Sequence, residues 1–411
     1  MSTPAPASAT EGFRPGFREF VAIIASVMAL VALGIDAMLP ALPAIGDSLG
    51  VTLENHRQYV ISAFMLGFGL AQIVIGTMSD RFGRRPVLIA ALGGYAVFAV
   101  VAAFAPSFEM LLLARAAQGA SAAGGRVLVT SIVRDRYAGR QMARVMSLAF
   151  IIFMAAPILA PAVGQAVLLF APWRWIFAVL AIAGAALLIW VTLRLPETLA
   201  PENRAPITPR RIATAFGRVV RDRQSSGYTL ALSLLTGALY GFINSVQQIV
   251  SQTFGKPELL VVVFGAVAST MAFGSFFNSR FVVRWGMRYI GHWALVGFIL
   301  FSALHFIIAL AGYETLVSFM ILQAAIMACF GLATSNFGAL AMEHLGDVAG
   351  TASSLQGSFS TIFGAGIGVA IGQSFDGTTV PLYGGFTLCG LLALGVLLIV
   401  ERGKLFHRSP E

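Results

Sequence analysis

The charged segment GTMSDRFGRRPVL (residues 76–88) lies between two apolar stretches, near 57–78 and 87–105, and each stretch is about as long as a membrane span. Its two glycines allow a tight turn, and three arginines stand close together in it. A short basic turn between two such stretches predicts two neighbouring helices that cross a membrane and are joined at one membrane face.

The rest of the chain repeats this pattern. Of its 411 residues, 58% are apolar and 11% are charged, against roughly 45–50% and about 25% in soluble proteins. This composition excludes a disordered chain, a collagen or a secreted disulfide scaffold. Apolar stretches bounded by charges or by Gly and Pro predict twelve spans, near 18–43, 57–78, 87–105, 108–133, 143–170, 173–193, 225–251, 259–281, 289–310, 315–341, 350–373 and 380–400.

One long polar segment, 194–224, divides these spans into two groups of six. We therefore expect an all-α polytopic membrane protein with twelve transmembrane helices in two pseudo-symmetric six-helix bundles, 18–193 and 225–401. Residues 1–17 and 402–411 are expected to be cytoplasmic tails, the first of them disordered. The part RRIATAFGRVVRD of the linker allows two readings, a short helix on the inner membrane surface or a solvated basic linker.

The distribution of lysine and arginine predicts the orientation. If the N-terminus is inside, the inner segments hold 22 of these residues and the outer loops hold three, Arg57, Arg174 and Lys256. Because cytoplasmic loops carry the excess of basic residues, both termini are expected in the cytoplasm. The expected location is a bacterial inner membrane.

Weak repeats relate the two groups of spans. Gly76 and Asp80 precede RFGRR, and Gly274 and Asn278 precede SRFVVRWGMR at an offset of 198 residues. The pairs 138–139 and 349–350 are both Ala-Gly and both precede the fifth span of a group. Two equivalent halves are typical of a transporter that rocks around a central site.

Asp36 is the only carboxylate well inside a predicted span, in SVMALVALGIDAMLPALPAIG (26–46). A charge near the bilayer centre costs about 2.5–3.5 kcal/mol, so this side chain must face protein or water. One reading makes Asp36 a proton-binding group, and the other makes it a helix cap or a buried ion-pair member. Pro40 and Pro43 predict that the outer end of this helix bends or ends, either as a hinge or as simple termination.

Arg115 is the natural partner of Asp36 by depth, because each lies about seven residues from the predicted outer end of its span. Arg126 is three helical turns further along the same face. Its side chain either binds substrate from the inner side or extends to the cytoplasmic surface.

The segment 76–88 is also a candidate conformational latch. Its glycines permit close helix approach, and Asp80 supplies a carboxylate that the N-terminus of the eleventh span, near Asp347, could attract. The other reading is a basic turn that only follows the orientation rule. The candidate latch residues are Gly76, Asp80, Arg81, Gly83, Arg84 and Arg134.

Polar residues inside the seventh span predict a wet central cavity, with interhelical hydrogen bonds as the alternative. Asn244, Gln247 and Gln248 share one helix face. The candidate cavity residues are Asp36, Tyr59, Phe64, Met65, Arg115, Gln118, Arg126, Tyr240, Asn244, Gln247, Gln248, Asn336 and Phe337.

Other ligands and partners are not indicated. Cys329 and Cys389 lie in apolar runs, the histidines are scattered, and the spacing fits no metal site or disulfide framework. We expect no metal, no cofactor, no enzymatic activity and no nucleic-acid partner, and a monomer in contact with membrane lipid.

Several motifs together resemble the major facilitator superfamily, in particular the twelve-helix drug:proton antiporters of the bicyclomycin/chloramphenicol-resistance branch. The matching segments occur in both halves and are GTMSDRFGRRPVL (76–88), DAMLPALP (36–43), LLLARAAQG (111–119), APILAPAVG (156–164), WRWIF (173–177), LPETL (195–199), AGTASSLQG (349–357) and FDG (375–377).

The resemblance implies export of small, moderately hydrophobic drugs by alternating access, driven by the proton gradient. Asp36 would take the proton, Arg115 would tune its carboxylate, and Asp80 would act in the latch. The fifth-helix antiporter motif would include Pro157, Pro161 and Gly164, although Ala160 stands where a glycine is usual.

Two other functions are alternatives to drug export. The chain could export an endogenous metabolite such as an amino acid or a sugar, with incidental drug transport. A membrane receptor or enzyme would need a soluble domain or a nucleophile or metal site, and the longest polar segment has only about 30 residues.

Overall fold

A computed structural model describes residues 15–137, 139–204, 209–345 and 349–406. The regular elements in these residues are all helices, and twelve of them have 20 residues or more. The first six long helices are α1 (Phe17–Asp36), α3 (Tyr59–Phe82), α4 (Arg84–Ala103), α5 (Phe108–Arg136), α6 (Gly139–Leu168) and α7 (Arg174–Arg194). The last six are α9 (Arg223–Gln248), α10 (Leu260–Trp285), α11 (Met287–Leu310), α12 (Leu316–Met342), α13 (Ala349–Gln373) and α14 (Val380–Val400).

Each predicted span coincides with one long helix, so the prediction of an all-α polytopic protein is confirmed. Ten of the helices are long and apolar enough to cross a membrane. The other two are α5 and α6. α5 carries Arg115 and Arg126 in its interior, and the apolar stretch of α6 in the described residues, Ala155–Leu168, is shorter than a membrane span.

Shorter elements lie at helix ends and in the linker. The predicted linker contains the helix α8, whereas its place on the inner membrane surface stays a prediction. Much of the two predicted tails lies outside the described residues. The short elements are η1 (Leu39–Ala41), α2 (Leu42–Ser48), η2 (Glu54–Gln58), η3 (Pro201–Asn203), α8 (Pro209–Arg221), the π-helix η4 (Ile249–Thr253) and η5 (Pro257–Leu259).

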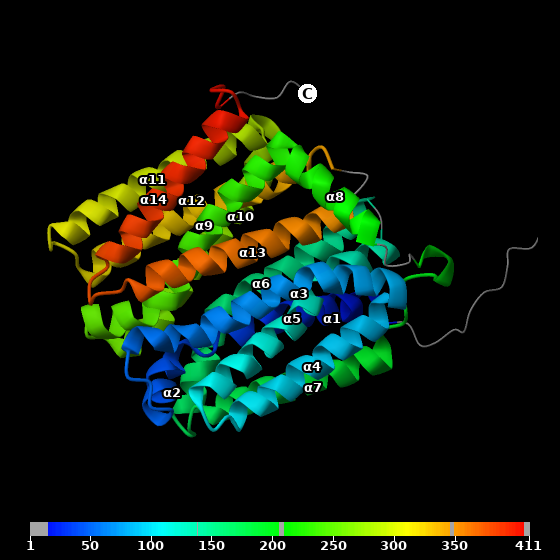
Figure 1. Ribbon diagram of the computed structural model, residues 1–411, viewed down its shortest axis with the longest axis horizontal. Coiled ribbons are helices and arrows are strands. Elements are labelled where there is room, and N and C mark those ends of the chain that lie inside the picture. The colour runs from blue at the N-terminus through cyan, green and yellow to red at the C-terminus, as the bar shows by residue number, and fades with distance from the viewer. Residues whose placement is uncertain (1–14, 138, 205–208, 346–348, 407–411) are drawn as a thin grey trace, which may run out of the picture.

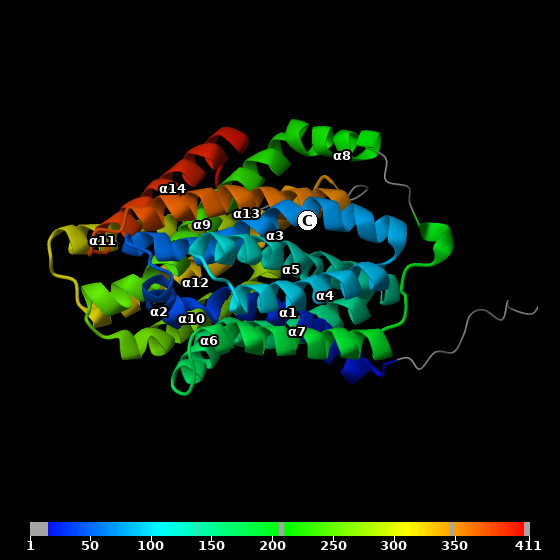
Figure 2. The same ribbon diagram turned by 60° about the horizontal axis from the view of Figure 1, so that its bottom comes forward.

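The two halves share one packing pattern. In the first half α3 packs on α5, α4 on α5 and α7, and α1 on α5, α6 and α7. The second half repeats it, with α10 on α12, α11 on α12 and α14, and α9 on α12, α13 and α14. Contacts between the halves follow the same symmetry, α3 with α13 and α10 with α6, and α3 lies beside α13 in both views (Figures 1 and 2).

The beginning of α1 and the end of α14 lie at the same end of the bundle as α8 (Figure 1). At that end Glu19 of α1 pairs with Arg194 of α7, and Arg223 of α9 donates a hydrogen bond to the carbonyl of Ile399 in α14. We call this end the linker end and the opposite one the far end. By the predicted orientation, the linker end is cytoplasmic.

Glycines allow the backbones of α3 and α5 to touch. A Cβ atom added to Gly67 would lie 1.9 Å from the carbonyl oxygen of Ala116, and one added to Gly119 would lie 2.0 Å from that of Phe64. Neither position can carry a side chain without moving a helix. The two helices therefore cross closely, as small residues permit in membrane proteins.

The second half contains the same crossing between α10 and α12. A Cβ atom added to Gly274 would lie 2.4 Å from the carbonyl oxygen of Ala328, and one added to Gly331 would lie 2.5 Å from that of Met271. On every helix the glycine stands three residues after its contact partner. This repeat of spacing is independent support for two equivalent halves.

The predicted correspondence of Gly76 with Gly274 is wrong. Gly274 packs against α12 in its own half, whereas a Cβ atom at Gly76 would lie 3.1 Å from the hydroxyl oxygen of Ser354 in the opposite half. The structural equivalents are Gly67 with Gly274, and Gly83 with Gly286, which end α3 and α10 at φ +101° and +81°. Charge pattern alone aligned the two loops in the wrong register.

The glycine crossing predicts a position-specific effect of valine. Gly119→Val should lower the free energy of unfolding by about 1–3 kcal/mol, because its side chain must displace α3. The matched control is Gly395→Val on α14, where no neighbouring atom lies within 4 Å. Thermal unfolding in detergent measures both variants, and equal midpoints would contradict the close crossing.

Candidate functional site

The first helix breaks at the buried carboxylate. α1 ends at Asp36, a turn follows, and η1 then contains Pro40. Proline lacks a backbone N–H, and its ring clashes with the carbonyl of the residue four positions earlier, which here is Asp36. The predicted location of Asp36 within a continuous helix is therefore wrong, and the predicted disruption by the prolines begins at Asp36 itself.

In the part of the chain that the structure describes, the Asp36 side chain has no hydrogen-bond or ion-pair partner. It is 5% exposed, and its Oδ1 atom accepts no hydrogen bond. Among the described residues no ion pair includes Asp36, and as the last residue of α1 it stands near carbonyl groups that disfavour negative charge. In this structure Asp36 therefore acts neither as a helix cap nor as a member of an ion pair.

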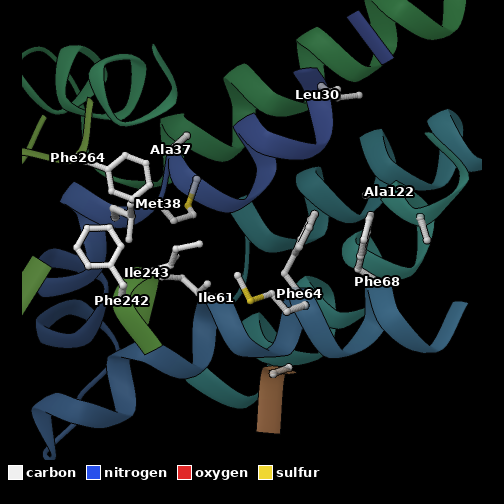
Figure 3. Close-up of a cluster of buried hydrophobic side chains, with 14 of the residues drawn as sticks. Leu30, Ala37, Met38, Ile61, Phe64, Phe68, Ala122, Phe242, Ile243 and Phe264 are labelled. Carbon is white, nitrogen blue, oxygen red and sulfur yellow. The ribbon is translucent and has the colours of Figure 1, made fainter. Parts of the chain in front are cut away.

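Apolar groups from both halves surround the break. Figure 3 shows Met38, just after Asp36, near the rings of Phe242 from α9 and Phe264 from α10. These two rings stack with their centroids 6.0 Å apart. The chain two residues after Asp36 therefore lies at an apolar junction between the halves.

The helix α6 approaches this break closely. A Cβ atom added to Gly164 would lie 2.1 Å from the carbonyl oxygen of Ala37 and 3.0 Å from Cγ of Pro40. Pro161 is buried in the same helix, and Pro157 also lies within it. The predicted motif of the fifth span thus packs against the residues that follow Asp36.

Arg115 is fully buried but does not pair with Asp36. Its guanidinium group donates to the carbonyl oxygens of Gly34 (2.8 Å) and Val60 (3.0 Å) and to Oε1 of Gln118 (2.8 Å). It also lies over the ring of Phe64, 4.5 Å from its centroid. The depth match was correct, since Arg115 reaches the helix of Asp36, but the direct pair is absent from the described contacts.

The helix break explains this partner choice. Gly34 is in the last turn of α1, where carbonyl groups have no partner within the helix. Arg115 satisfies one of these groups and connects α5 to α1 and α3. Of the other predicted cavity residues, Phe64 and Gln118 belong to this arrangement.

The polar residues of the seventh span join the halves at the far end. Gln58 of η2 donates to Oε1 of Gln248, and Gln248 donates to Oδ1 of Asn55 (2.8 Å). Ser62 also donates to Oδ1 of Asn244 (3.4 Å). The prediction that Asn244 and Gln248 face a wet cavity is therefore wrong in this structure, and the alternative of hydrogen bonds between helices is correct.

Bonds to the end of α13 complete this junction, and sequence reasoning missed them. Asn55 donates to the carbonyl oxygens of Gln373 (3.0 Å) and Phe375 (2.9 Å), and Gln58 donates to that of Gly372 (3.1 Å). The partners are neutral amides and carbonyls. Only the Asn and Gln content of these loops could have indicated them.

The contact between α3 and α13 continues toward the linker end. Ser358 donates to the carbonyl oxygen of Gly69 (2.6 Å), and Gln72 donates to Oγ1 of Thr361 (3.2 Å). Gly76 faces Ser354 near the last turns of α3. The two halves are thus joined along most of this helix pair.

Some of the remaining cavity candidates lie away from Asp36, and others lie near it. Gln247 donates to Ser251 on its own helix, and Tyr59 stacks on His56 at the far end. Asn336 binds Asn278, and Phe337 packs on Tyr228, so both lie inside the second half, which contradicts their predicted place in the cavity. Met65 is buried and Arg126 is exposed. The half-buried Tyr240 of α9 forms a hydrogen bond with Thr361 and lies close enough to Asp36 and Arg126 to interact with both charges, so the structure brings these three candidates together.

At the linker end Arg84 connects the candidate latch. It lies 2.5 Å from Asp80 and 3.1 Å from Asp135, measured from guanidinium nitrogen to carboxylate oxygen. Arg81 and Arg134 are exposed. Asp135, which directly follows the predicted Arg134, is the residue of α5, the fourth long helix, that pairs with Arg84. The expected attraction of Asp80 to the start of α13 involves residues 346–348, which lie outside the described residues, so it stays a prediction.

Glu197 fixes the start of α4. Gly83 turns the chain with a positive φ, and the next two backbone N–H groups, of Arg84 and Arg85, donate to the Glu197 carboxylate at 2.9 and 3.3 Å. A carboxylate at a helix N-terminus is favourable. Sequence analysis noted LPETL only as a similarity and missed this contact.

The second half has an equivalent charged cluster. Arg288, near the start of α11, lies 3.0 Å from Glu343 at the end of α12 and 3.2 Å from Glu401 after α14. Burial raises the pKa of Glu343, but hydrogen bonds from Gln224 and Arg288 and the charge of Arg288 lower it overall. Arg288 is the counterpart of Arg84, but its printed partners include no carboxylate of α10 in the place of Asp80, where the sequence repeat has Asn278.

Comparisons with known proteins agree with this architecture. A family model described as Major Facilitator Superfamily matches residues 24–369. The "Uncharacterized MFS-type transporter YdgK" of Bacillus subtilis (strain 168) is 29% identical, over 88% of this chain and 90% of that protein. The "Bicyclomycin resistance protein homolog" of Haemophilus influenzae (strain Rd) is also 29% identical, over 92% and 94%.

Solved structures show the same fold. A bacterial homologue of the human lysosomal transporter Spinster, in an inward-facing and occupied conformation, matches with a TM-score of 0.75 and 17% identity, over 97% of this chain and 100% of that chain. The resemblance stated from the motifs is therefore confirmed.

The Arg84 cluster predicts a difference between two neighbouring arginines. Arg84→Ala should lower the free energy of unfolding by about 2–3 kcal/mol, because it leaves Asp135 without a cation. The loss is moderated because the Asp80 side chain is 49% exposed. Arg81→Ala, which removes an exposed charge, should cost less than about 1 kcal/mol. Thermal unfolding compares them, and equal losses would contradict the cluster.

Proposed function

Because this chain belongs to the Major Facilitator Superfamily, we propose that it exports small, moderately hydrophobic drugs in exchange for protons, by alternating access. A relative that covers most of the chain is named for bicyclomycin resistance. The proposed substrates are therefore antibiotics of the bicyclomycin or chloramphenicol type.

The main support for the proposal is the environment of the Asp36 side chain. Among the described residues its carboxyl group is buried without a hydrogen bond or an ion pair, and Met38, two residues later, lies at the apolar junction with Phe242 and Phe264. When protonated, it is neutral and suits this environment. When deprotonated, it needs water or a polar ligand. Access of water from alternate sides would therefore load and release a proton at this position.

The same position can couple protons to drug. An apolar drug that reaches Met38 would cover the carboxyl group and compete with the water that the charged form requires. A neutral substrate fits this competition best, because Asp36 has no second carboxylate beside it on the first helix, where Met28 and Ala29 stand. One elementary charge entering per cycle would gain about 2.3 kcal/mol per 100 mV of membrane potential.

The role proposed for Arg115 is to position the break. Its bond to the carbonyl of Gly34 fixes the end of α1, and its bond to Val60 fixes that end relative to α3. Arg115 would thus influence the protonation of Asp36 through geometry. Arg126, which is exposed on the same helix, remains a candidate for substrate contact or for contact with the cytoplasmic surface.

Alternating access would use the contacts between the halves. Opening at the far end must break the hydrogen bonds that the side-chain amides of Asn55 and Gln58 donate. Opening at the linker end must separate Gly76 from Ser354. We place the linker end and both termini in the cytoplasm and the chain in the inner membrane of a bacterium, as a monomer that needs no cofactor.

Replacement of Asp36 tests proton coupling. Asp36→Asn should abolish drug export driven by a pH gradient in everted vesicles, because the amide cannot exchange a proton. Drug binding in detergent should persist, since the amide resembles the protonated acid. Asp47→Asn is the control, because Asp47 is 72% exposed and pairs only with Arg57 in the described structure. If Asp36→Asn exports drug at the parent rate under the same pH gradient, proton coupling through Asp36 is refuted.

Gly164 tests whether the geometry of the break matters. Gly164→Ala should reduce export severalfold, because the methyl group must push α6 away from the carbonyl of Ala37. The same change at Gly338, which has no atom within 4 Å, should leave export unchanged. Transport rates per folded protein measure both variants, and equal rates would argue against a role for this contact.

A further inference from the structure

The linker helix α8 packs against the linker end of α13. Val219 of α8 is buried in a cluster with Leu345, Ala352 and Leu355. Ile73 of α3 packs against the same cluster, three residues before Gly76 meets Ser354. α8 therefore lies beside the place where α3 and α13 join the two halves.

A second apolar surface of α8 is exposed. Phe216 and Val220 stand four residues apart, so they share a helix face, and their side chains are 54% and 55% exposed. Two large exposed apolar side chains that share one face of a helix suit contact with an apolar phase such as the acyl chains of lipids. Figures 1 and 2 show α8 outside the packed bundle, beyond the start of α9.

Basic residues accompany this surface. Arg218 and Arg221 are exposed on the side of α8 away from Phe216 and Val220. The linker end is also where the sequence concentrates its arginines. A short helix with an apolar face and an arginine face is suited to the membrane interface, where guanidinium groups bind lipid phosphates.

We propose that α8 binds anionic phospholipids through Arg218 and Arg221, with Phe216 and Val220 inserted among the acyl chains, and thereby holds α13 against α3 at the linker end. Val219 makes the link, because it connects the lipid-bound helix to α13. The lipid contact stands by itself, whereas its effect on opening rests on the proposed alternating access.

The lipid contact is tested by fluorescence quenching. A fluorophore is attached at Ala213→Cys, an exposed position of α8, after Cys329→Ser and Cys389→Ala remove the native thiols. The protein is reconstituted into phosphatidylcholine vesicles that contain brominated phosphatidylglycerol or an equal amount of brominated phosphatidylcholine. Phosphatidylglycerol should quench at least about twofold more strongly, and high salt should remove the difference.

Charge variants make this test specific. The double variant Arg218→Gln/Arg221→Gln should lose the preference for phosphatidylglycerol. The control Arg280→Gln/Arg284→Gln removes two exposed arginines from the same end, on α10, and should retain it. Equal quenching by the two lipids in the parent protein would overturn the proposed binding of anionic lipid and leave a contact with lipid of any charge. No quenching would overturn the lipid contact itself and leave α8 in water or under another protein segment.

Coupling to α13 is tested by distance. Spin labels at Met78→Cys on α3 and Ser353→Cys on α13 report the separation of the two helices at the linker end in nanodiscs, without drug or proton gradient. Replacing phosphatidylglycerol by phosphatidylcholine, or adding the Arg218/Arg221 changes, should enlarge the longer-distance population at least about twofold. Unchanged distances would refute the coupling, and because no transport is measured, this outcome differs from a failure of the proposed export.

Discussion

The early end of α1, which Pro40 imposes, is the constraint around which the first half is arranged. Pro40 has no N–H for the carbonyl of Asp36 and its ring clashes with that carbonyl, so the helix ends and the carbonyl groups of its last turn need other partners, as every backbone polar group does within a bilayer. The protein satisfies one of them, at Gly34, with the guanidinium group of Arg115. It also brings α6 within backbone contact of the break at Gly164. Asp36 receives neither a cation nor a donor, so its unpaired state is specific to this residue and is not a general defect of the break.

The two halves are equivalent in packing but not in chemistry. Both contain the glycine crossing and an arginine cluster at the linker end, centred on Arg84 and Arg288. Only the first half breaks its leading helix at a carboxylate. The corresponding helix α9 keeps its regular course to Gln248 and then continues as a π-helix, and its polar residues bond to the first half. A symmetric scaffold thus supports one helix break at a buried carboxylate in the first half and, in the second half, one polar surface that bonds to the first half.

Some of this was accessible from sequence, and the failures have physical causes. Apolar length predicted the twelve helices, because membrane thickness fixes that length. Pro40 stands four residues after Asp36, a spacing that predicts a helix end at Asp36. The apolar residues continue past this point, so the sequence pattern alone predicted one longer span. The equal depths of Asp36 and Arg115 in their spans correctly predicted that Arg115 reaches α1. They did not show whether its partner there is a carboxylate or a backbone carbonyl. The face shared by Asn244 and Gln248 was read correctly, yet whether it meets water or another helix depends on which end of the bundle is closed.

The chemistry of the two ends suits different tasks. At the far end the halves are joined by neutral amides such as Asn55, Gln58 and Gln248, and each such bond contributes only about 1 kcal/mol because water can replace it. At the linker end the ion pairs of Arg84 and Arg288 lie within one half each, so they rigidify the halves and leave the boundary to small residues such as Gly76 and Ser354. Contacts that cross the boundary are therefore the replaceable ones, and contacts inside each half are the costly ones. That division allows two rigid halves to separate at either end without breaking a buried ion pair.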